Sequence, residues 1–388
     1  MILARNIALA AVLAIFSLAP AWANPLLLVD RSNLQVLYAE EAGQPWHPAS
    51  LTKLMTAYVV FEEIANGNVT LDTPVTVSRK AFNQAPSKSG LAVDSSVSMK
   101  DALYILIVKS ANDIAVAIAE TVSGSEDNFV IKMNDVARRM GLTGSYFVNS
   151  HGLHDPAQVT TARDLAVLSL YIEQTFPQYM PMFATGVVTI GNTRMESNNG
   201  LLEGFAGTTG MKTGYVCASG LNLVATVDRG GRQLLAVVLG GSSGRDRNER
   251  AAELFLNGLN GRVSPTGQTV LTMANSGGTP TDMRANICGA NAAAYVKAQE
   301  AAFPMGLKDQ PSYLTDKVAL TEYRAVDLGR VRNNIALPRP RPPHVPMFPS
   351  PASAPTLESA NIDDVLRPGL TTAGGVTVTM PRPRPADL

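Results

Sequence analysis

The chain has 388 residues, and its 32 basic and 32 acidic side chains leave a formal net charge of zero at pH 7. A neutral balance gives no electrostatic reason to expect nucleic acid as a partner. The only two cysteines, Cys217 and Cys288, cannot form a structural zinc site alone, so neither a metal nor a cofactor is expected. The length suits one large domain with an appendage.

The first 23 residues are typical of a secretory signal peptide. Arg5 supplies a positive charge, residues 7–19 are apolar, and Ala21-Trp22-Ala23 places small residues at a cleavage point. The apolar run is shorter than the roughly 20 residues that span a membrane, which favours cleavage over an uncleaved anchor. The sequence therefore predicts export to an oxidising compartment, where the two cysteines are expected to form one disulfide.

The first half of the chain predicts a hairpin followed by helices. Residues 25–41 contain two short apolar strands around a polar turn. Helical spacing then covers residues 50–67, and a turn-rich region follows at 71–97. Residues 99–122 return to helical spacing, but periodicity leaves open whether this is one helix or two helices broken near Ser110.

The second half predicts further helices and a late hairpin. Helices are expected at 129–140 and, opened by a capping box, at 161–172. Residues 221–239 alternate apolar side chains around a glycine-containing turn, which is typical of a hairpin, and a helix follows at 248–259. Helices between an early and a late hairpin indicate an α+β fold in which an antiparallel sheet, built from both chain ends, is flanked by helices.

Beyond Gly261 the composition changes. Residues 262–332 are weakly periodic, and the proline-rich repeat at 338–342 recurs at 381–385. Such a tail cannot bury enough apolar surface to fold alone, and catalysis is expected not to need it. The expected organisation is a signal peptide at 1–23, a catalytic domain at 24–261, an extension at 262–332 and an extended or disordered tail at 333–388.

Ser50-Leu51-Thr52-Lys53 is the first candidate for chemistry. At positions i and i+3 of a helix, Ser50 and Lys53 share one face, and a helix N-terminus favours developing negative charge. A serine hydroxyl needs a base to accept its proton, and lysine becomes that base where burial or nearby positive charge favours its neutral amine. Alone the motif is weak, because an N-cap serine followed by a surface lysine has the same spacing.

Two further triplets strengthen this interpretation. Ser110-Ala111-Asn112 offers a hydroxyl and an amide. Lys212-Thr213-Gly214 offers a cation for a carboxylate, with a glycine that lets a substrate backbone approach a strand edge. All three motifs in this order, behind a signal peptide, form the set found in penicillin-binding proteins and β-lactamases.

Over residues 24–261 the chain resembles the low-molecular-mass penicillin-binding proteins of the D-alanyl-D-alanine carboxypeptidase type. The resemblance implies a β-lactamase/transpeptidase-like fold, with a helical lobe, an α/β lobe and the site between them. It also implies a periplasmic serine enzyme that removes the terminal D-alanine from peptidoglycan stem pentapeptides and that β-lactams acylate. The matching segments are 47–53, 110–113, 149–156, 161–166, 211–215 and 218–224.

The resemblance assigns roles to the first two motifs. Ser50 forms the acyl-enzyme and Lys53 is its general base. Ser110 helps to relay protons, and Asn112 holds either the substrate amide or Lys53.

The resemblance also assigns the carboxylate site and the oxyanion hole. Lys212-Thr213-Gly214 forms the substrate strand, with the lysine and threonine on the terminal carboxylate. The N–H groups of Ser50 and Tyr215 form the oxyanion hole. Arg247 falls where the family has a second carboxylate contact and Arg245 is its rival, although both also fit surface residues that precede a helix.

Several alternatives stay open at this level. Class A β-lactamases share the motifs but carry an aspartate where this chain has Ala111, and a wall-binding protein without catalysis would not need Ser50 and Lys53. The family often continues into a β-rich domain and an amphipathic membrane anchor. Neither is evident after Gly261, so tethering to the inner membrane stays open. The His151 and His154 spacing indicates a turn and not a metal site.

Overall fold

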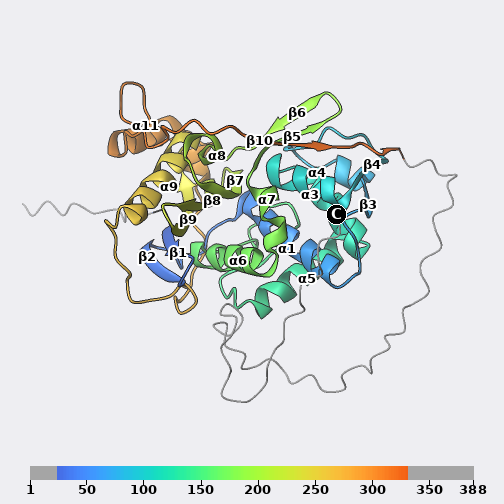
Figure 1. Ribbon diagram of the computed structural model, residues 1–388, viewed down its shortest axis with the longest axis horizontal. Helices are drawn as coiled ribbons and strands as arrows, with labels where there is room; N and C mark the ends of the chain where they lie inside the picture. Colours follow the sequence, from blue (N-terminus) through green and yellow to red (C-terminus); the bar gives the residue numbers. More distant parts are fainter. Residues whose placement is uncertain (1–23, 331–388) are drawn as a thin grey trace, which may run out of the picture.

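The computed structural model of the protein describes residues 24–330 (Figure 1). The predicted signal peptide and proline-rich tail lie outside these residues. The sheet and its outer helix lie at the left of Figure 1, and most of the helical lobe lies at the right. Among the described residues, no helix combines the length and the apolar character needed to cross a membrane.

A five-stranded antiparallel sheet organises the left-hand lobe, with the strand order β2-β1-β9-β8-β7. Both predicted hairpins form, and β1 pairs with β9, so the two ends of the domain meet in one sheet. Strand β7, which carries the Lys212 motif, lies at one edge. The strands are β1 (Leu26–Asp30), β2 (Gln35–Glu40), β7 (Thr208–Val216), β8 (Gly220–Arg229) and β9 (Arg232–Gly241).

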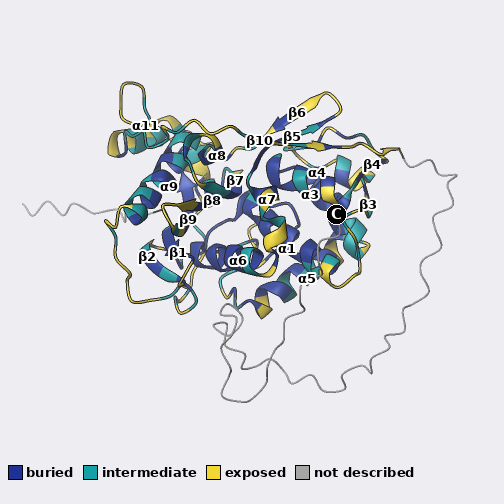
Figure 2. Cartoon of the chain, in the orientation of Figure 1, coloured by how far each residue is buried: buried dark blue, intermediate teal, exposed yellow. Residues whose placement is uncertain are grey.

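The sheet is buried on both faces, because helices cover each side. Successive side chains of a strand point to opposite faces. In β9, Val237 and Leu239 join the core that also contains α6 (Ala162–Thr175), whereas Ala236 and Val238 pack in a second core with residues of α9 (Gly244–Leu259). The central strands and helices are accordingly dark blue in Figure 2.

The helical lobe surrounds α1, most of whose length is buried. The open question at residues 99–122 resolves into two helices, because Ser110 between them has φ = 62° and cannot continue a right-handed helix. The elements of this lobe are η1 (Ala49–Leu51), α1 (Thr52–Ala65), β3 (Pro74–Thr76), α2 (Arg79–Phe82), β4 (Ser95–Ser98), α3 (Met99–Val108), α4 (Asn112–Ser123) and α5 (Glu126–Arg139).

Two helix starts illustrate how local signals act. Only half of the predicted capping box at α6 forms: the Thr161 side chain accepts a hydrogen bond from the Asp164 N–H at 3.0 Å. The Asp164 carboxylate instead accepts from the Gly144 N–H and the Ser145 hydroxyl, both at 2.8 Å. Helix α9 begins at Gly244, four residues before the predicted start, because Ser243 caps it by accepting from the Asp246 N–H. The alternative that Arg245 and Arg247 are surface residues before a helix is therefore wrong, since both lie within α9.

The extension after Gly261 packs back onto the rest of the structure. Strand β10 pairs in parallel with β5, and β11 pairs with β4. Tyr323 of β10 stacks on Tyr104 with ring centroids 3.5 Å apart. The remaining elements are η2 (Pro177–Tyr179), α7 (Met180–Phe183), β5 (Thr185–Ile190), β6 (Thr193–Glu196), α8 (Leu201–Gly204), α10 (Arg284–Ile287), α11 (Ala292–Ala302), β10 (Thr321–Ala325) and β11 (Gly329–Arg330).

Cys217 and Cys288 form a disulfide with their Cα atoms 5.6 Å apart. The bridge joins the residue after β7 to the residue after α10 and spans 71 residues of sequence. Met283, just before α10, is buried and donates its N–H to the Ala218 carbonyl at 3.0 Å. The disulfide thus fastens the extension to the turn between β7 and β8.

We expect removal of this disulfide to destabilise the protein. The Cys217→Ala/Cys288→Ala variant should lose roughly 2–4 kcal/mol of unfolding free energy, because the cross-link restricts the unfolded chain. Urea unfolding of both proteins measures the difference. Peptide mapping without reductant should recover the two cysteines in one linked peptide, and recovery of two alkylated thiols from the native protein would contradict the pairing.

Candidate active site

Ser50 lies in the short turn η1, which leads directly into α1. The preceding residue, Ala49, has φ = 48°, in the left-handed region. For a non-glycine residue this conformation costs about 1–3 kcal/mol and persists only where the surroundings impose it. The position of Ser50 therefore depends on the packing around the turn and not on the conformational preference of the turn itself.

Two glycines impose the conformation of this turn from outside. Gly152 has φ = +90°, and a Cβ atom there would lie 1.9 Å from the Ala49 carbonyl oxygen. A Cβ atom on Gly214 of β7 would lie 3.0 Å from the Ser50 nitrogen. The sequence assigned Gly214 to the approach of a substrate. In the structure the glycine is already required by the close approach of the protein's own backbone.

Lys53 lies one turn of helix beyond Ser50 and is only 1% exposed. Its Nζ atom is 3.0 Å from the Ser50 Oγ, 2.7 Å from the Asn112 Oδ1 and 2.5 Å from the His151 carbonyl oxygen. Three segments far apart in the sequence therefore converge on one amine. Two of its three neighbours are carbonyl oxygens, which can only accept hydrogen bonds.

The environment of Lys53 favours its neutral form. Burial lowers the pKa of Lys53 well below its ordinary value, and the positive charge of Lys212 lowers it further, while Asp113 opposes both effects. A neutral amine has two N–H groups and one lone pair. Because Asn112 and His151 take the two N–H groups, the lone pair faces the Ser50 hydroxyl. This is the arrangement of a general base beside its nucleophile.

The second motif lies on the opposite wall of the site. The Ser110 hydroxyl is buried and has no hydrogen-bond partner among residues 24–330. Of the two roles that the sequence left open for Asn112, the structure shows contact with Lys53, and the Asn112 amide nitrogen donates to the Ala85 carbonyl at 2.9 Å. Asn112 is thereby oriented with its oxygen toward Lys53.

Strand β7 brings a second buried amine to the site. Lys212 is 3% exposed, and its Nζ donates to the Thr213 carbonyl at 2.9 Å. Burial lowers the pKa of Lys212 to about 7, and the positive charge of Arg247 adds to this effect. A negatively charged ligand beside Lys212 would raise its pKa again and favour the protonated amine.

The two arginines that compete for the carboxylate role point to different places. Arg247 is 5% exposed, borders the cavity beside Ser50 and donates from Nη2 to the Asn198 carbonyl at 2.7 Å. Arg245 instead donates from Nη1 to the carbonyls of Phe303 and Met305 in the extension. The geometry thus places Arg247, and not Arg245, next to the reactive serine.

A cavity of about 550 Å³ lies over the nucleophile. Lys53 and Lys212 are not among the residues that line it. Lys53 contacts the lining residue Ser50, and Lys212 contacts the lining residue Thr213. The other residues predicted from the three motifs, together with Arg247, line the cavity: Ser50, Ser110, Asn112, Thr213, Gly214, Tyr215 and Arg247.

The site and fold agree with a known family. A family model described as D-alanyl-D-alanine carboxypeptidase matches residues 17–243. The chain belongs to this family. The match covers all three predicted motifs and ends just before the helix that carries Arg247.

Individual members of the D-alanyl-D-alanine carboxypeptidase family are moderately similar. The chain is 37% identical over 240 residues to the D-alanyl-D-alanine carboxypeptidase DacD of Escherichia coli (strain K12), covering 60% of this chain and 62% of that protein. It is 34% identical over 248 residues to DacC of the same organism, covering 62% and 61%. The chain thus spans less than two thirds of the length of these curated relatives.

A solved structure confirms the transpeptidase-like fold. Penicillin binding protein 6B from Escherichia coli superposes with a TM-score of 0.58 at 36% identity, over 63% of this chain and 80% of that one. Penicillin-binding protein D2 from Listeria monocytogenes, solved in its cefotaxime-bound form, gives a TM-score of 0.54 at 28% identity, over 61% and 97%.

One member of the site escaped the sequence prediction. His151 was assigned to a turn, and its segment does form a loop, but its backbone carbonyl is a direct neighbour of Lys53. A backbone contact leaves no side-chain signature in the sequence. The only available signal was that residues 149–156 matched the family, with Gly152 among them.

The burial of Lys53 predicts a pH-dependent difference in stability. Because the pKa of Lys53 is lower in the folded than in the unfolded state, folding releases its proton at pH values between the two. Relative to the Lys53→Met variant, the protein should gain about 1.4 kcal/mol of unfolding free energy per pH unit between this lowered pKa and the ordinary value of about 10.4.

Urea unfolding of both proteins across this pH range measures the difference. Lys308→Met is the control, because the Lys308 side chain is exposed and its amine stays in water in both states. A pH-independent difference for Lys53→Met would contradict a neutral amine beside Ser50.

Proposed function

We propose that this protein is a serine-type D-Ala-D-Ala carboxypeptidase that removes the terminal D-alanine from the stem pentapeptides of peptidoglycan. The observation that carries this proposal is the buried Lys53 amine, whose Nζ lies 3.0 Å from the Ser50 Oγ at the edge of a cavity. Membership of the family supports the choice of substrate.

The proposed reaction begins with a proton transfer. Lys53 takes the Ser50 proton while Oγ attacks the carbonyl carbon of the penultimate D-alanine, and the peptide bond to the last residue breaks. The N–H groups of Ser50 and Tyr215 stabilise the oxyanion. The leaving amine receives the proton from Lys53, with the Ser110 hydroxyl as the relay. Water then hydrolyses the acyl-enzyme, which regenerates Ser50 and releases the shortened peptide.

The cavity also suggests why a chain end would be chosen over an internal bond. A C-terminal residue carries a full negative charge next to the scissile amide. Arg247 and Thr213 border the cavity, and Lys212 lies just behind its wall. Binding of a carboxylate there would pair two buried cations that otherwise repel each other.

β-Lactams are proposed as covalent inhibitors of the same site. Penicillin-binding protein D2 of Listeria monocytogenes, a structural neighbour, has been solved with cefotaxime and with ampicillin bound. A β-lactam combines an acylating carbonyl with a nearby carboxylate, which suits Ser50 and Arg247 respectively. A β-lactamase would hydrolyse the resulting ester rapidly, whereas a carboxypeptidase should retain it.

Export to the periplasm, by way of a cleavable signal peptide, is part of the proposal. The pattern of residues 1–23 supports it, as does a disulfide that an oxidising compartment would maintain. Cell fractionation tests it, and recovery of the full-length protein in the cytoplasm would refute it.

We expect a fluorescent penicillin to label the protein covalently at Ser50, and a D-Ala-D-Ala-terminated pentapeptide to lose one D-alanine. Ser50→Ala should abolish both reactions, and Lys53→Ala should slow both severely, because Lys53 is the base that contacts the hydroxyl in the described part of the chain. Gel fluorescence and mass detection of the shortened peptide measure the outcome.

The control addresses the possibility that Ser50 only starts a helix. Ser98→Ala removes the side-chain cap of α3 and should cost about 1 kcal/mol of stability without affecting labelling. Full labelling of Ser50→Ala would refute the mechanism. Labelling without any release of D-alanine would favour a wall-binding protein, and rapid loss of the label would favour a β-lactamase.

Recognition of the chain end predicts a substrate-dependent effect of Arg247→Ala. Loss of one charge-assisted hydrogen bond should lower kcat/KM for the free-acid peptide about ten- to a hundredfold. The C-terminally amidated peptide is already a poor substrate and should change little. Arg245→Ala should affect neither peptide, because Arg245 forms its hydrogen bonds with the extension and does not line the cavity within residues 24–330. An equal loss for both peptides with Arg247→Ala would mean that this arginine is structural.

A further inference from the structure

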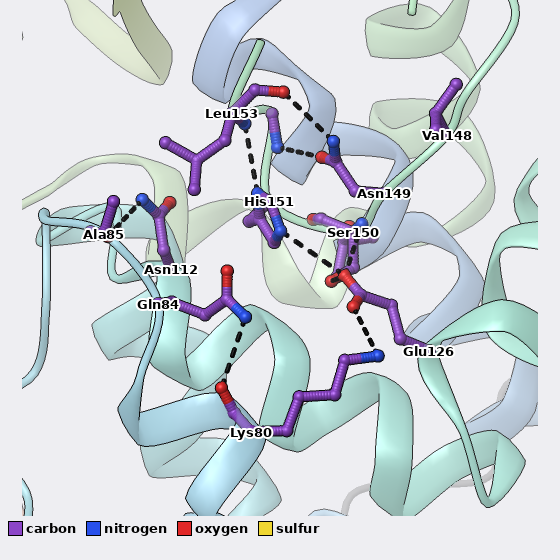
Figure 3. A network of polar contacts seen from close by, with 12 residues as sticks. Lys80, Gln84, Ala85, Asn112, Glu126, Val148, Asn149, Ser150, His151 and Leu153 are labelled. Carbon is purple, nitrogen blue, oxygen red and sulfur yellow. Dashed lines mark hydrogen bonds and ion pairs between the residues drawn. The ribbon is translucent and has the colours of Figure 1, made fainter. Parts of the chain in front are cut away.

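The carbonyl of His151 is one of the two acceptors that orient Lys53, yet it belongs to a loop. Figure 3 shows the polar contacts around this loop. Gly152 directly follows and lies against the Ala49 backbone, so a small shift of the loop would move both the base and the nucleophile. What holds the His151 peptide in place therefore bears on the chemistry.

A single buried carboxylate holds this peptide from one side. Glu126, in the first turn of α5, is 7% exposed. Its Oε1 accepts from the Ser150 hydroxyl at 2.8 Å and from the Ser150 N–H at 3.2 Å (Figure 3). On the other side, Thr56 of α1 donates its hydroxyl to the Ser150 carbonyl at 2.6 Å. Residue 150 is thus fixed at three points immediately before His151.

The imidazole of His151 is held by a hydrogen bond at one nitrogen and lies near Glu126 with the other. Its Nδ1 accepts from the Leu153 N–H at 3.1 Å, so the ring proton resides on Nε2, which lies 3.5 Å from the Glu126 carboxylate. Burial lowers the pKa of His151 to about 4, with Glu126 opposing and the Lys53 and Lys80 charges adding to the effect. The ring is therefore neutral near pH 7, with Nε2 near the Glu126 carboxylate but not hydrogen-bonded to it.

The other oxygen of Glu126 reaches a second segment of the site. Its Oε2 lies 3.1 Å from the Lys80 Nζ in α2 (Figure 3). Helix α2 leads into the loop whose Ala85 carbonyl orients the Asn112 amide. Glu126 thus contacts Ser150, which precedes the His151 carbonyl, and Lys80, whose helix leads to the Ala85 carbonyl that orients Asn112.

We propose that Glu126 is a positioning residue for proton transfer between Ser50 and Lys53. By holding Ser150, directly before His151, it keeps the His151 carbonyl on the Lys53 amine and the amine beside the serine hydroxyl. This inference rests on the proposed function, because it assumes that Lys53 is the general base.

The simpler explanation is that Glu126 only anchors α5, and the chain offers a matched control for it. Glu63 of α1 is also a buried glutamate, 8% exposed, and it also binds a lysine, with 2.7 Å between its Oε1 and the Lys132 Nζ. Its side-chain partners, Lys132 and Asn68, have no contact with Lys53. Glu63→Ala should therefore report the stability effect alone.

The experiment compares the wild type, Glu126→Ala, Glu126→Gln and Glu63→Ala in D-alanine release, penicillin acylation rate and Tm. Glu126→Ala should lower kcat and the acylation rate at least about tenfold with KM changed less than about twofold, because misplacing a catalytic group affects the chemical step. Glu126→Gln keeps an acceptor for Ser150 and should recover most of the rate. Glu63→Ala should lower Tm and leave kcat unchanged.

The outcomes distinguish failure of the proposed function from failure of the role assigned to Glu126. If the wild type neither releases D-alanine nor is acylated, the proposed function fails. If the wild type reacts and Glu126→Ala keeps its kcat while losing Tm as Glu63→Ala does, Glu126 is only structural and the inference is overturned. Should Glu126→Ala not fold, Glu126→Asp shortens the side chain and withdraws the carboxylate from both the Ser150 hydroxyl and the Ser150 N–H, and an unchanged kcat in that variant overturns the inference equally.

Discussion

The Lys53 amine is buried, and no carboxylate among residues 24–330 is hydrogen-bonded to it. Removing a cation from water is expensive, and the amine avoids that cost by giving up its proton. Its remaining hydrogen-bonding capacity is then matched by two carbonyl oxygens and one hydroxyl. Those three partners come from η1, from the start of α4 and from the loop before α6, so the burial of Lys53 constrains how these segments pack.

The segments around the amine carry backbone strain that the rest of the fold must compensate. Ala49 and Ser110 both adopt left-handed conformations beside the site, which neither side chain favours. They lie just before α1 and α4, in each of which most residues are buried. The apolar contacts of those helices supply the free energy that keeps both residues in place, so the precision of the site depends on the core of the helical lobe.

Local signals in the sequence predicted local structure well. The two hairpins and the cap at Thr161 depend on residues a few positions apart, and each formed as expected. The three motifs were also found, because their chemistry resides in side chains.

The features that were missed depend on contacts that the sequence pattern does not show. The start of α9 was misplaced because its first turn is set by the Ser243 cap and not by the apolar periodicity on which the prediction relied. The carbonyl of His151 and the carboxylate of Glu126 could not be assigned, since their roles arise only when α5 and the loop after it meet. The strand β10 was missed because its parallel partner, β5, lies far away in the sequence and little of its surface is buried.

The contact between Tyr323 and Asp101 has a consequence for the order in which the molecule assembles. The Tyr323 hydroxyl donates to the Asp101 carboxylate at 2.7 Å across 222 residues of sequence, and β1 pairs with β9 over a similar span. Contacts between residues so far apart in the sequence raise the contact order, and closing such long loops costs entropy before the contacts form, which slows folding. A chain emerging from its N-terminus can form α1 and the helices around it early. Strand β10 can pack on α3 and pair with β5 only after the final part of the described chain has been synthesised, so this part of the helical lobe is completed late.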